Sequence, residues 1–129
     1  MRILADTCIF LSILYNEPFS KKAMSLLKTN KPIISVITLS EILASSYKKE
    51  PEMSIKAKAL VERFVGCDNI ISVTGDIAEL AGKLKSKYSR DFSLADAIIL
   101  ATAFFADCDA IATFDSEFKK AEEIKIIGI

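Results

Sequence analysis

The sequence begins Met1-Arg2-Ile3-Leu4-Ala5-Asp6, a short apolar run that ends in a carboxylate. Such a run is typical of a buried β-strand, because it is apolar, short and followed by a polar residue. A second run of this kind, Ala110-Ile111-Ala112-Thr113, is followed two residues later by Asp115. If both strands belong to one parallel sheet, their acids lie together at its carboxyl edge, where open α/β folds bind ligands.

Apolar runs alternate with helical periods along the whole chain. This alternation predicts an α/β fold, a three-layer α/β/α sandwich with a mainly parallel central sheet of four to five strands. The predicted strands cover residues 2–5, 32–36, 69–73, 110–113 and 124–127. The predicted helices cover residues 7–15, 19–28, 38–49, 54–65, 74–88, 93–106 and 116–121. We see no linker or repeat, so we expect a single domain over residues 1–129.

The composition excludes several classes of function. The formal net charge is zero, so any nucleic-acid role must depend on local patches or on bound metal. The chain has no histidine, which excludes the Ser/His/Asp triad, the Cys/His dyad and the usual zinc sites. No stretch is long and apolar enough to span a membrane, and no export signal is evident. We therefore expect a cytoplasmic protein without membrane contact.

The cysteines give a weaker indication of the compartment. Cys8, Cys67 and Cys108 are odd in number, far apart and without a CxxC pair. We expect free thiols in a reducing compartment rather than a disulfide framework. Each lies among apolar residues, so we expect all three in the core.

Two further acids, Glu41 and Asp96, lie in the first turns of helices expected to begin at Thr38 and Ser93. The second helix is apolar nearly all round, which predicts a buried central helix. A charge in such a helix is costly unless it is paired or bound to metal. Four carboxylates at one edge would repel one another and hold some protonated, unless a cation joined them. Oxygen ligands favour Mg²⁺ or Mn²⁺ over zinc.

Each acid also has an ordinary structural interpretation. Thr38 to Glu41 fits a capping box, Ser93 to Asp96 nearly fits one, and the acids at 6 and 115 fit N-caps. Asp76 is a further acid after a strand, and we interpret it as a helix-start charge. The four candidates come from four separate segments, which favours a shared site over four unrelated caps.

A run of cations ends the helix predicted at 74–88. It consists of Lys83, Lys85, Lys87 and Arg90. Cations near a helix C-terminus interact favourably with the helix dipole, so a solvated face is the simpler interpretation. Contact with phosphate is the less favoured alternative. Clustered cations are only a weak signal of nucleic-acid binding.

Four segments resemble, in order and spacing, the motifs of PIN-domain nucleases. The strand-ending Leu4-Ala5-Asp6-Thr7 is similar to the first motif, and residues 38–42 are similar to the helix-borne Glu motif. The segment Leu94-Ala95-Asp96-Ala97-Ile98-Ile99-Leu100-Ala101-Thr102-Ala103 resembles the third motif most specifically. Residues 112–118 resemble the fourth. The match spans essentially the whole chain, and its compact length resembles VapC-type toxins of prokaryotic toxin–antitoxin pairs.

The resemblance implies a metal-dependent endoribonuclease that uses Mg²⁺ or Mn²⁺ and leaves a 5′-phosphate and a 3′-hydroxyl. The implied catalytic and metal-binding residues are Asp6, Glu41, Asp96 and Asp115. Thr7 and Thr113 would orient carboxylates or water, although local backbone hydrogen bonds would also explain them. Glu117 would be an additional outer acid or a solvated helix-start charge.

The resemblance also implies partners. These are an RNA substrate, a cognate antitoxin protein and a second copy of the chain in a homodimer. The helical pair after the second strand is the expected dimer surface, through the residues Ile42, Leu43, Tyr47, Leu60, Val61 and Phe64. The same residues would also suit the core of a monomer.

Three alternatives are weighed against this hypothesis. A phosphoacceptor receiver domain needs paired acids after the first strand, an acceptor Asp after a middle strand and a Lys after a late strand. Here Asp6 stands alone, the third strand leads to Thr74 and the late strand leads to Phe114, so the receiver fold fails on all three. A catalytically inactive PIN-fold interaction module has no need of a costly acidic pocket. A housekeeping RNA-processing PIN nuclease stays open beside the toxin.

Overall fold

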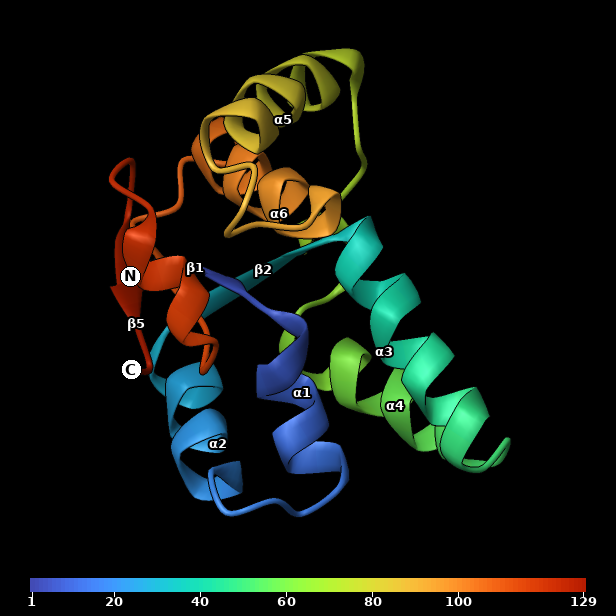
Figure 1. Ribbon diagram of the computed structural model, residues 1–129. Coiled ribbons are helices and arrows are strands. Elements are labelled where there is room, and N and C mark those ends of the chain that lie inside the picture. The colour runs from blue at the N-terminus through green and yellow to red at the C-terminus, as the bar shows by residue number, and fades with distance from the viewer.

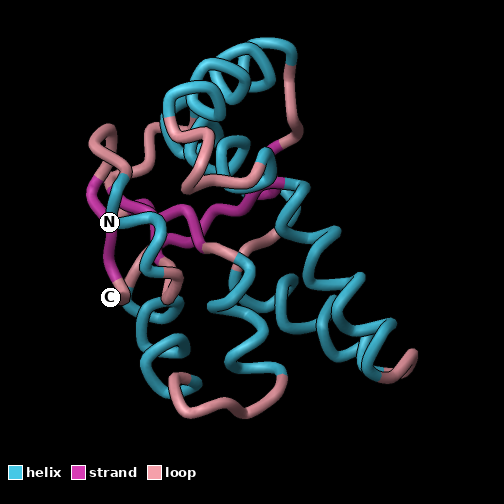
Figure 2. The backbone as a smooth tube through the Cα atoms, in the orientation of Figure 1, coloured by secondary structure: helices cyan, strands magenta, loops and turns pink.

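Five short parallel strands form the centre of the molecule, in the spatial order β3-β2-β1-β4-β5. The computed structural model describes residues 1–129. The strands are β1 (Arg2–Ala5), β2 (Lys31–Ser35), β3 (Ile70–Ile71), β4 (Ala110–Ala112) and β5 (Lys125–Ile127). Every neighbouring pair runs parallel, as predicted. In Figure 2 these strands lie together between the helices.

Helices cover both faces of the sheet, which confirms the predicted three-layer sandwich. One layer contains α1 (Thr7–Leu14), α2 (Ser20–Thr29), α3 (Val36–Lys49) and α4 (Met53–Phe64). The other contains α5 (Gly75–Lys87) and α6 (Leu94–Phe105). Figure 1 shows α5 and α6 above the sheet and the other four helices below it. Two short 3₁₀ helices, η1 (Cys67–Asn69) and η2 (Ser116–Lys120), complete the chain.

The strands supply side chains to two separate cores, because successive residues of a strand point to opposite faces. Leu4, Ile33 and Ile111 pack with α5 and α6 in one core. Ile3 and Ala5 pack with the first four helices in the other. Strands buried on both faces are continuous apolar runs, which is why the sequence predicts them well.

The strand order places one edge of the sheet at a topological switch. The chain runs outward from β1 to β2 and β3, then returns to form β4 on the other side of β1. The carboxyl ends of β1 and β4 are therefore adjacent, and Asp6 N donates to Ala112 O at 2.9 Å. Ligands of open α/β sheets bind at such a point, where the connections diverge to the two faces.

The start of α3 differs from the sequence prediction. The helix begins at Val36 rather than at Thr38, because the Ser35 hydroxyl at the end of β2 accepts from Ile37 N at 3.2 Å and caps the helix. Thr38 is buried, and its hydroxyl has no hydrogen-bond partner. The predicted capping box from Thr38 to Glu41 is therefore wrong, and Glu41 lies in the second turn of α3.

The bounds predicted for the second and third strands also need correction. The second strand, predicted at 32–36, ends at residue 35, because residue 36 already belongs to α3. The third strand, predicted at 69–73, keeps only Ile70–Ile71, because η1 occupies the residues before it. This short β3 lies at the edge of the sheet and pairs with β2 alone.

The helix α6 is buried only at its centre. The prediction of a helix that is buried nearly all round is therefore wrong at its two ends. Three apolar side chains near its ends are well exposed: Leu94 is 56% exposed, Phe104 65% and Phe105 46%. The central residues lie between the sheet and α5, whereas the two ends project beyond that contact. No helix in the chain is both long and apolar enough to cross a membrane.

The cysteine prediction is wrong in part. The three thiols are free, but Cys67 is exposed in η1, and Cys8 and Cys108 are only half-buried. Cys67 follows Gly66, which has a positive φ of 74° and turns the chain out of α4. The apolar residues near Cys67 in sequence therefore pack inward while its own side chain faces solvent.

Candidate metal centre

Asp6 lies at the switch point between β1 and β4, where it caps α1. Its side chain is buried, and Oδ1 accepts a hydrogen bond from Thr7 N at 2.8 Å. Oδ2 accepts a hydrogen bond from the Thr113 hydroxyl at 2.8 Å. Burial is the main reason that the pKa of Asp6 is raised from 3.8 to about 6; the charges of Asp96 and Glu41 also raise it, and the hydrogen bonds from Thr113 and Thr7 lower it in part. The carboxyl group is fixed in position but poorly compensated in charge.

Thr113 joins two of the predicted acids. It is buried directly after β4, and its hydroxyl donates to Asp6 while it accepts from Asp115 N at 3.0 Å. A hydroxyl has one proton, so donation to one group and acceptance from the other fix its orientation. The end of β1 and the loop after β4 are held in register by this side chain.

Glu41 approaches the same place from α3. Its carboxylate is exposed, and Oε1 accepts a hydrogen bond from the Thr7 hydroxyl at 2.8 Å. Thr7 thus links Asp6 through its backbone and Glu41 through its side chain. The bond from Thr7 is the only side-chain hydrogen bond of Glu41, and its second oxygen, Oε2, has no protein partner.

Asp96 combines both interpretations given by the sequence. It completes a capping box, in which Ser93 N donates to its Oδ2 at 3.2 Å and its own N–H donates to the Ser93 hydroxyl. Carboxylate oxygens of Asp96, Asp115 and Glu117 also lie within 4.8 Å of one another. The capping box therefore orients the acid toward other carboxylates rather than away from them.

Asp115 and Glu117 stand at the start of η2. The Asp115 carboxylate accepts from Glu117 N at 3.0 Å and caps this short helix. The structure thus places the outer acid Glu117 beside Asp96 and Asp115, while Asp6 and Glu41 fall outside the 4.8 Å group. Asp6 stays connected to it through Thr113 and through its electrostatic contact with Asp96.

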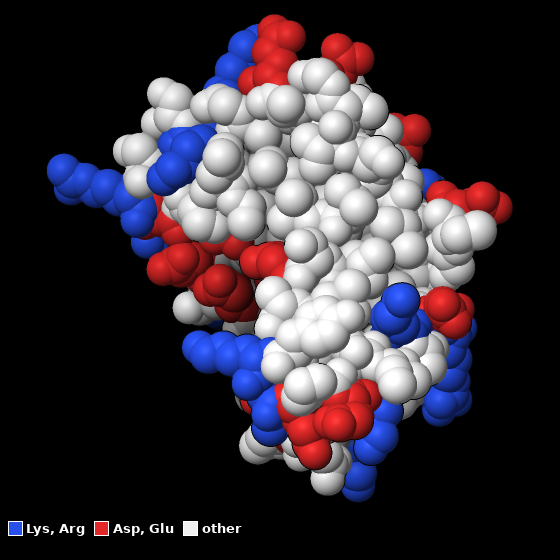
Figure 3. Space-filling view, turned by 90° about the vertical axis from the view of Figure 1, so that its right-hand side faces the viewer, with Lys and Arg blue, Asp and Glu red and all other residues white.

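No lysine or arginine forms an ion pair with any of these acids. All four ion pairs of the molecule involve other carboxylates. Figure 3 shows acidic side chains gathered at a hollow beside a broad face without charged groups. Several carboxylates close together without a paired cation attract a positive ion, so the cluster is suited to bind a cation. The donors are all oxygens, which fits Mg²⁺ or Mn²⁺.

Cys8 is a site neighbour that the sequence analysis assigned only to the core. Its thiol donates to Asp6 Oδ2 at 3.7 Å, lies 3.5 Å from the Thr113 hydroxyl and accepts from Phe114 N at 3.3 Å. Burial, followed by the charge of Asp6, raises the pKa of Cys8 to about 11, so the thiol stays protonated. Its position two residues after a strand-ending acid was the available sequence signal.

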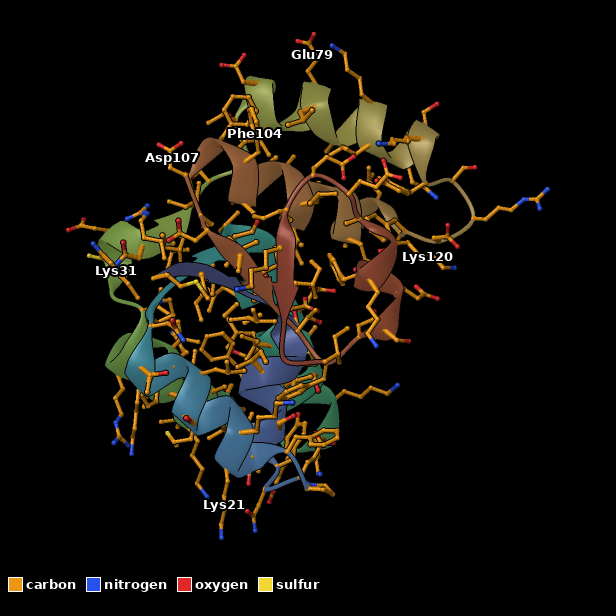
Figure 4. All side chains as sticks on the ribbon, turned by 90° about the vertical axis from the view of Figure 1, so that its left-hand side faces the viewer. Lys21, Lys31, Glu79, Phe104, Asp107 and Lys120 are labelled. Carbon is orange, nitrogen blue, oxygen red and sulfur yellow. The ribbon has the colours of Figure 1, made fainter.

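The pockets of the molecule lie elsewhere. One of about 330 Å³ is lined by Leu80, Leu84, Leu100, Phe104 and Glu123. In Figure 4, Phe104 and Asp107 lie on one side of the molecule and Lys120, on η2, lies on the other. None of the cavities is lined by the predicted site residues, so the acids form an open surface site.

Comparisons with known proteins agree with this geometry. The PIN domain family model matches residues 3–124. A toxin–antitoxin complex from Klebsiella pneumoniae has a chain with a TM-score of 0.78 and 26% identity, and the match covers 98% of this chain and 96% of that one. No match was found among curated proteins.

Two other solved structures are similar in fold. VapBC2 from Rickettsia felis, bound to a DNA fragment from its promoter, matches with a TM-score of 0.77 and 20% identity over 98% of this chain and 97% of that one. Mycobacterium tuberculosis VapC20, named a Sarcin-Ricin loop cleaving toxin, matches with a TM-score of 0.78 and 19% identity over 93% and 95%. Because the PIN domain family model matches residues 3–124 of the 129 in this chain, the chain belongs to the PIN domain family.

Proposed function

We propose that this protein is a Mg²⁺- or Mn²⁺-dependent endoribonuclease and the toxin of a toxin–antitoxin pair. The observation that carries the proposal is the gathering of Asp6, Glu41, Asp96 and Asp115 at one sheet edge without a single paired cation. Uncompensated acids reduce stability, so a protein that keeps them has a use for them. Nucleases of this family are expected to use such acids for metal binding.

The residues that would hold the metal are Asp96 and Asp115, with Asp6 beside them and Glu117 as a further oxygen donor. A divalent cation bound there would stabilise negative charge on the phosphate and make a water more acidic. Thr113 and Thr7 hold the Asp6 carboxylate in one orientation. No histidine is available for general acid–base work.

Glu41 is the residue we assign to water activation. Its Oε1 is held by the Thr7 hydroxyl, which leaves Oε2 free to accept a proton from an attacking water. The residue is exposed and lies beside the buried Asp6, so its carboxylate is open to solvent and substrate. Single-stranded or looped RNA is the favoured substrate, because its flexible backbone brings a phosphate to the fixed acids more readily than a stiff duplex does.

The toxin role is supported by the structural relatives. Several are toxin–antitoxin complexes, and the chain covers nearly their full length as well as its own. We therefore propose an antitoxin protein as a partner. The proposal of RNA as the substrate class takes support from the VapC20 toxin, which is named for cleaving the Sarcin-Ricin loop.

We also propose a homodimer, but the predicted surface needs correction. Ile42 and Val61 are 0% and 2% exposed within one chain, so they belong to the core and not to an interface. Tyr47 of the same predicted set is 57% exposed, and further exposed apolar side chains occur at Val36 and Leu94, at the starts of α3 and α6. Light scattering should give a dimer mass that Leu94→Lys reduces to that of a monomer; a strict monomer in the unmodified protein would contradict the proposal.

The central experiment is cleavage of a labelled single-stranded RNA by the purified protein. Cleavage should require Mg²⁺ or Mn²⁺, stop with EDTA, and be lost in Asp6→Ala. Asp76→Asn is the matched control, because Asp76 is also an acid after a strand but belongs only to the first turn of α5. Cleavage that persists in EDTA or in Asp6→Ala would contradict the proposed mechanism.

A further inference from the structure

Two aromatic rings beside the acids have no part in the chemistry described above. Phe114 stands between Thr113 and Asp115, and its ring packs on the ring of Phe19 with centroids 5.0 Å apart and planes tilted by 39°. Phe19 immediately precedes α2 and is 55% exposed. One face of Phe19 is covered by its partner, while much of the ring is open to solvent.

A cation is held over the same pair. Lys22, three residues after Phe19 and in the first turn of α2, places Nζ 6.0 Å from the centroid of the Phe114 ring. Its ammonium donates to Gly128 O at 2.7 Å, which fixes one of its three donors and leaves two free. The exposed ring and the positive charge thus form one surface.

This surface is tied directly to the acidic cluster. Phe114 N donates to Cys8 Sγ at 3.3 Å, and the same thiol donates to Asp6 Oδ2. The ring of Phe114 therefore extends from a backbone segment that is fixed against Asp6 on one side and Asp115 on the other. A linear substrate with one group bound on the rings could therefore place a neighbouring phosphate at the acids.

The other exposed aromatic cluster differs in its charge. Phe104 and Phe105 are also exposed and packed on each other, with centroids 5.4 Å apart. Four carboxylates line their cavities, with a single cation, Lys83, that is itself 3.9 Å from Glu79; the carboxylates are those of Asp76, Glu79, Asp107 and Glu123. Acids of this kind repel a phosphate backbone, whereas Lys22 attracts one. The charge therefore distinguishes the two aromatic surfaces.

We propose that Phe19, Phe114 and Lys22 form a subsite for one unpaired nucleobase and a neighbouring phosphate of single-stranded RNA. The inference rests on the proposed nuclease function. Aromatic rings stack on any base, because every base has a π-face, so the subsite positions RNA without selecting sequence. The lysine neutralises a phosphate next to the stacked base. The subsite would hold the strand so that the adjoining phosphodiester lies at the acids.

The test compares Phe19→Leu with Phe19→Trp. Leucine keeps apolar bulk but removes the π-face, so KM for single-stranded RNA should rise by about tenfold with kcat unchanged. Tryptophan should restore KM. Phe104→Leu is the control, because it removes another exposed ring, 65% against 55% for Phe19, at the opposite end of α6 from Asp96, and it should leave KM unchanged.

A binding measurement separates this subsite from the proposed chemistry. Fluorescence anisotropy with the Asp96→Asn protein measures RNA affinity without cleavage, using oligonucleotides that carry one abasic position. The abasic oligonucleotide should bind the Asp96→Asn protein more weakly than the intact oligonucleotide does. The double variant with Asp96→Asn and Phe19→Leu should bind both oligonucleotides equally. If RNA is bound but Phe19→Leu changes neither KM nor affinity, the subsite proposal is wrong and the rings are left for a protein partner. If no RNA is bound or cleaved at all, the proposed function fails first.

Discussion

The acids of this protein fall into two groups with opposite surroundings. At the C-terminal segment, Glu123 is 2.9 Å from Lys87 Nζ and accepts from the Tyr88 hydroxyl. Partial burial raises its pKa, but the hydrogen bonds from Lys87 and Tyr88 outweigh burial and hold it below the usual value. At the carboxyl edge, Asp6 is buried without a cation, and its pKa is raised to about 6.

The comparison shows what each group does for the protein. The paired acids tie the C-terminal segment to the end of α5 and favour the folded state. Asp6 acts against it: its pKa, raised from 3.8 to about 6, corresponds to a cost of ~3 kcal/mol when the group is ionised. A cation supplied from solution would remove this cost. The difference supports the proposed cation-binding role of these acids independently of any motif.

The largest expected effect follows from Asp96→Asn. The amide oxygen still accepts from Ser93 N, so the capping box survives, while the charge at the acidic cluster is lost. RNA cleavage should fall at least about a hundredfold, as when one electrostatic contact to a transition state is removed. Thermal unfolding without metal should be unchanged or shifted slightly upward. A large loss of stability in the metal-free variant would show that capping is the main role of Asp96.

A smaller effect concerns the stability of the metal-free protein and its pH dependence. Because the pKa of Asp6 is higher in the folded state, that state binds more protons, and stability falls as pH rises from about 4 to about 6. Asp6→Asn should remove this dependence. At pH 8 the variant should gain up to ~3 kcal/mol of stability, because it buries no charge. It should lose ~1 kcal/mol of that gain, because one amide oxygen cannot accept from both Thr7 and Thr113.

Urea unfolding of both proteins with and without Mg²⁺ provides the measurement. Mg²⁺ should stabilise the unmodified protein at pH 8 and stabilise Asp6→Asn less, because Asp96 and Asp115 remain but the charge of Asp6 beside them is lost. It should also lose its effect below about pH 6, because protonated carboxylates bind metal weakly. A variant less stable than the unmodified protein at pH 8 would mean that the hydrogen bonds to Asp6 outweigh its burial.

Most of the fold was predictable, because strands buried on both faces are continuous apolar runs. The order of elements and the parallel sheet follow from that pattern. The start of α3 did not follow, since Ser35 and Thr38 are both hydroxyl residues able to cap a helix. Tertiary packing decides between them by burying Thr38 in the helix.

The site was predictable to a lesser degree. Sequence placed four acids after strands and in helices, and the structure brings them to one edge of the sheet. Their metal-binding roles remain a prediction. What sequence could not give was the pairing of charges, because Lys87 and Glu123 are 36 residues apart and meet only through the fold. For the same reason Cys8 and Phe114, 106 residues apart, were not recognised as neighbours.

The smallest expected effect is that of Glu123→Gln, which tests the other half of the comparison. The change removes the ion pair with Lys87 but keeps an acceptor for the Tyr88 hydroxyl, so the melting temperature should fall only slightly. Because the Glu123 pKa is lowered by folding, its contribution is present at neutral pH and is lost as pH falls. Added salt should shrink the effect, since the pair is partly exposed, whereas the effect of the buried Asp6 should persist. RNA cleavage and the response to Mg²⁺ should not change. If Glu123→Gln altered either, the paired acids would not be purely structural, and the contrast between the two groups would fail.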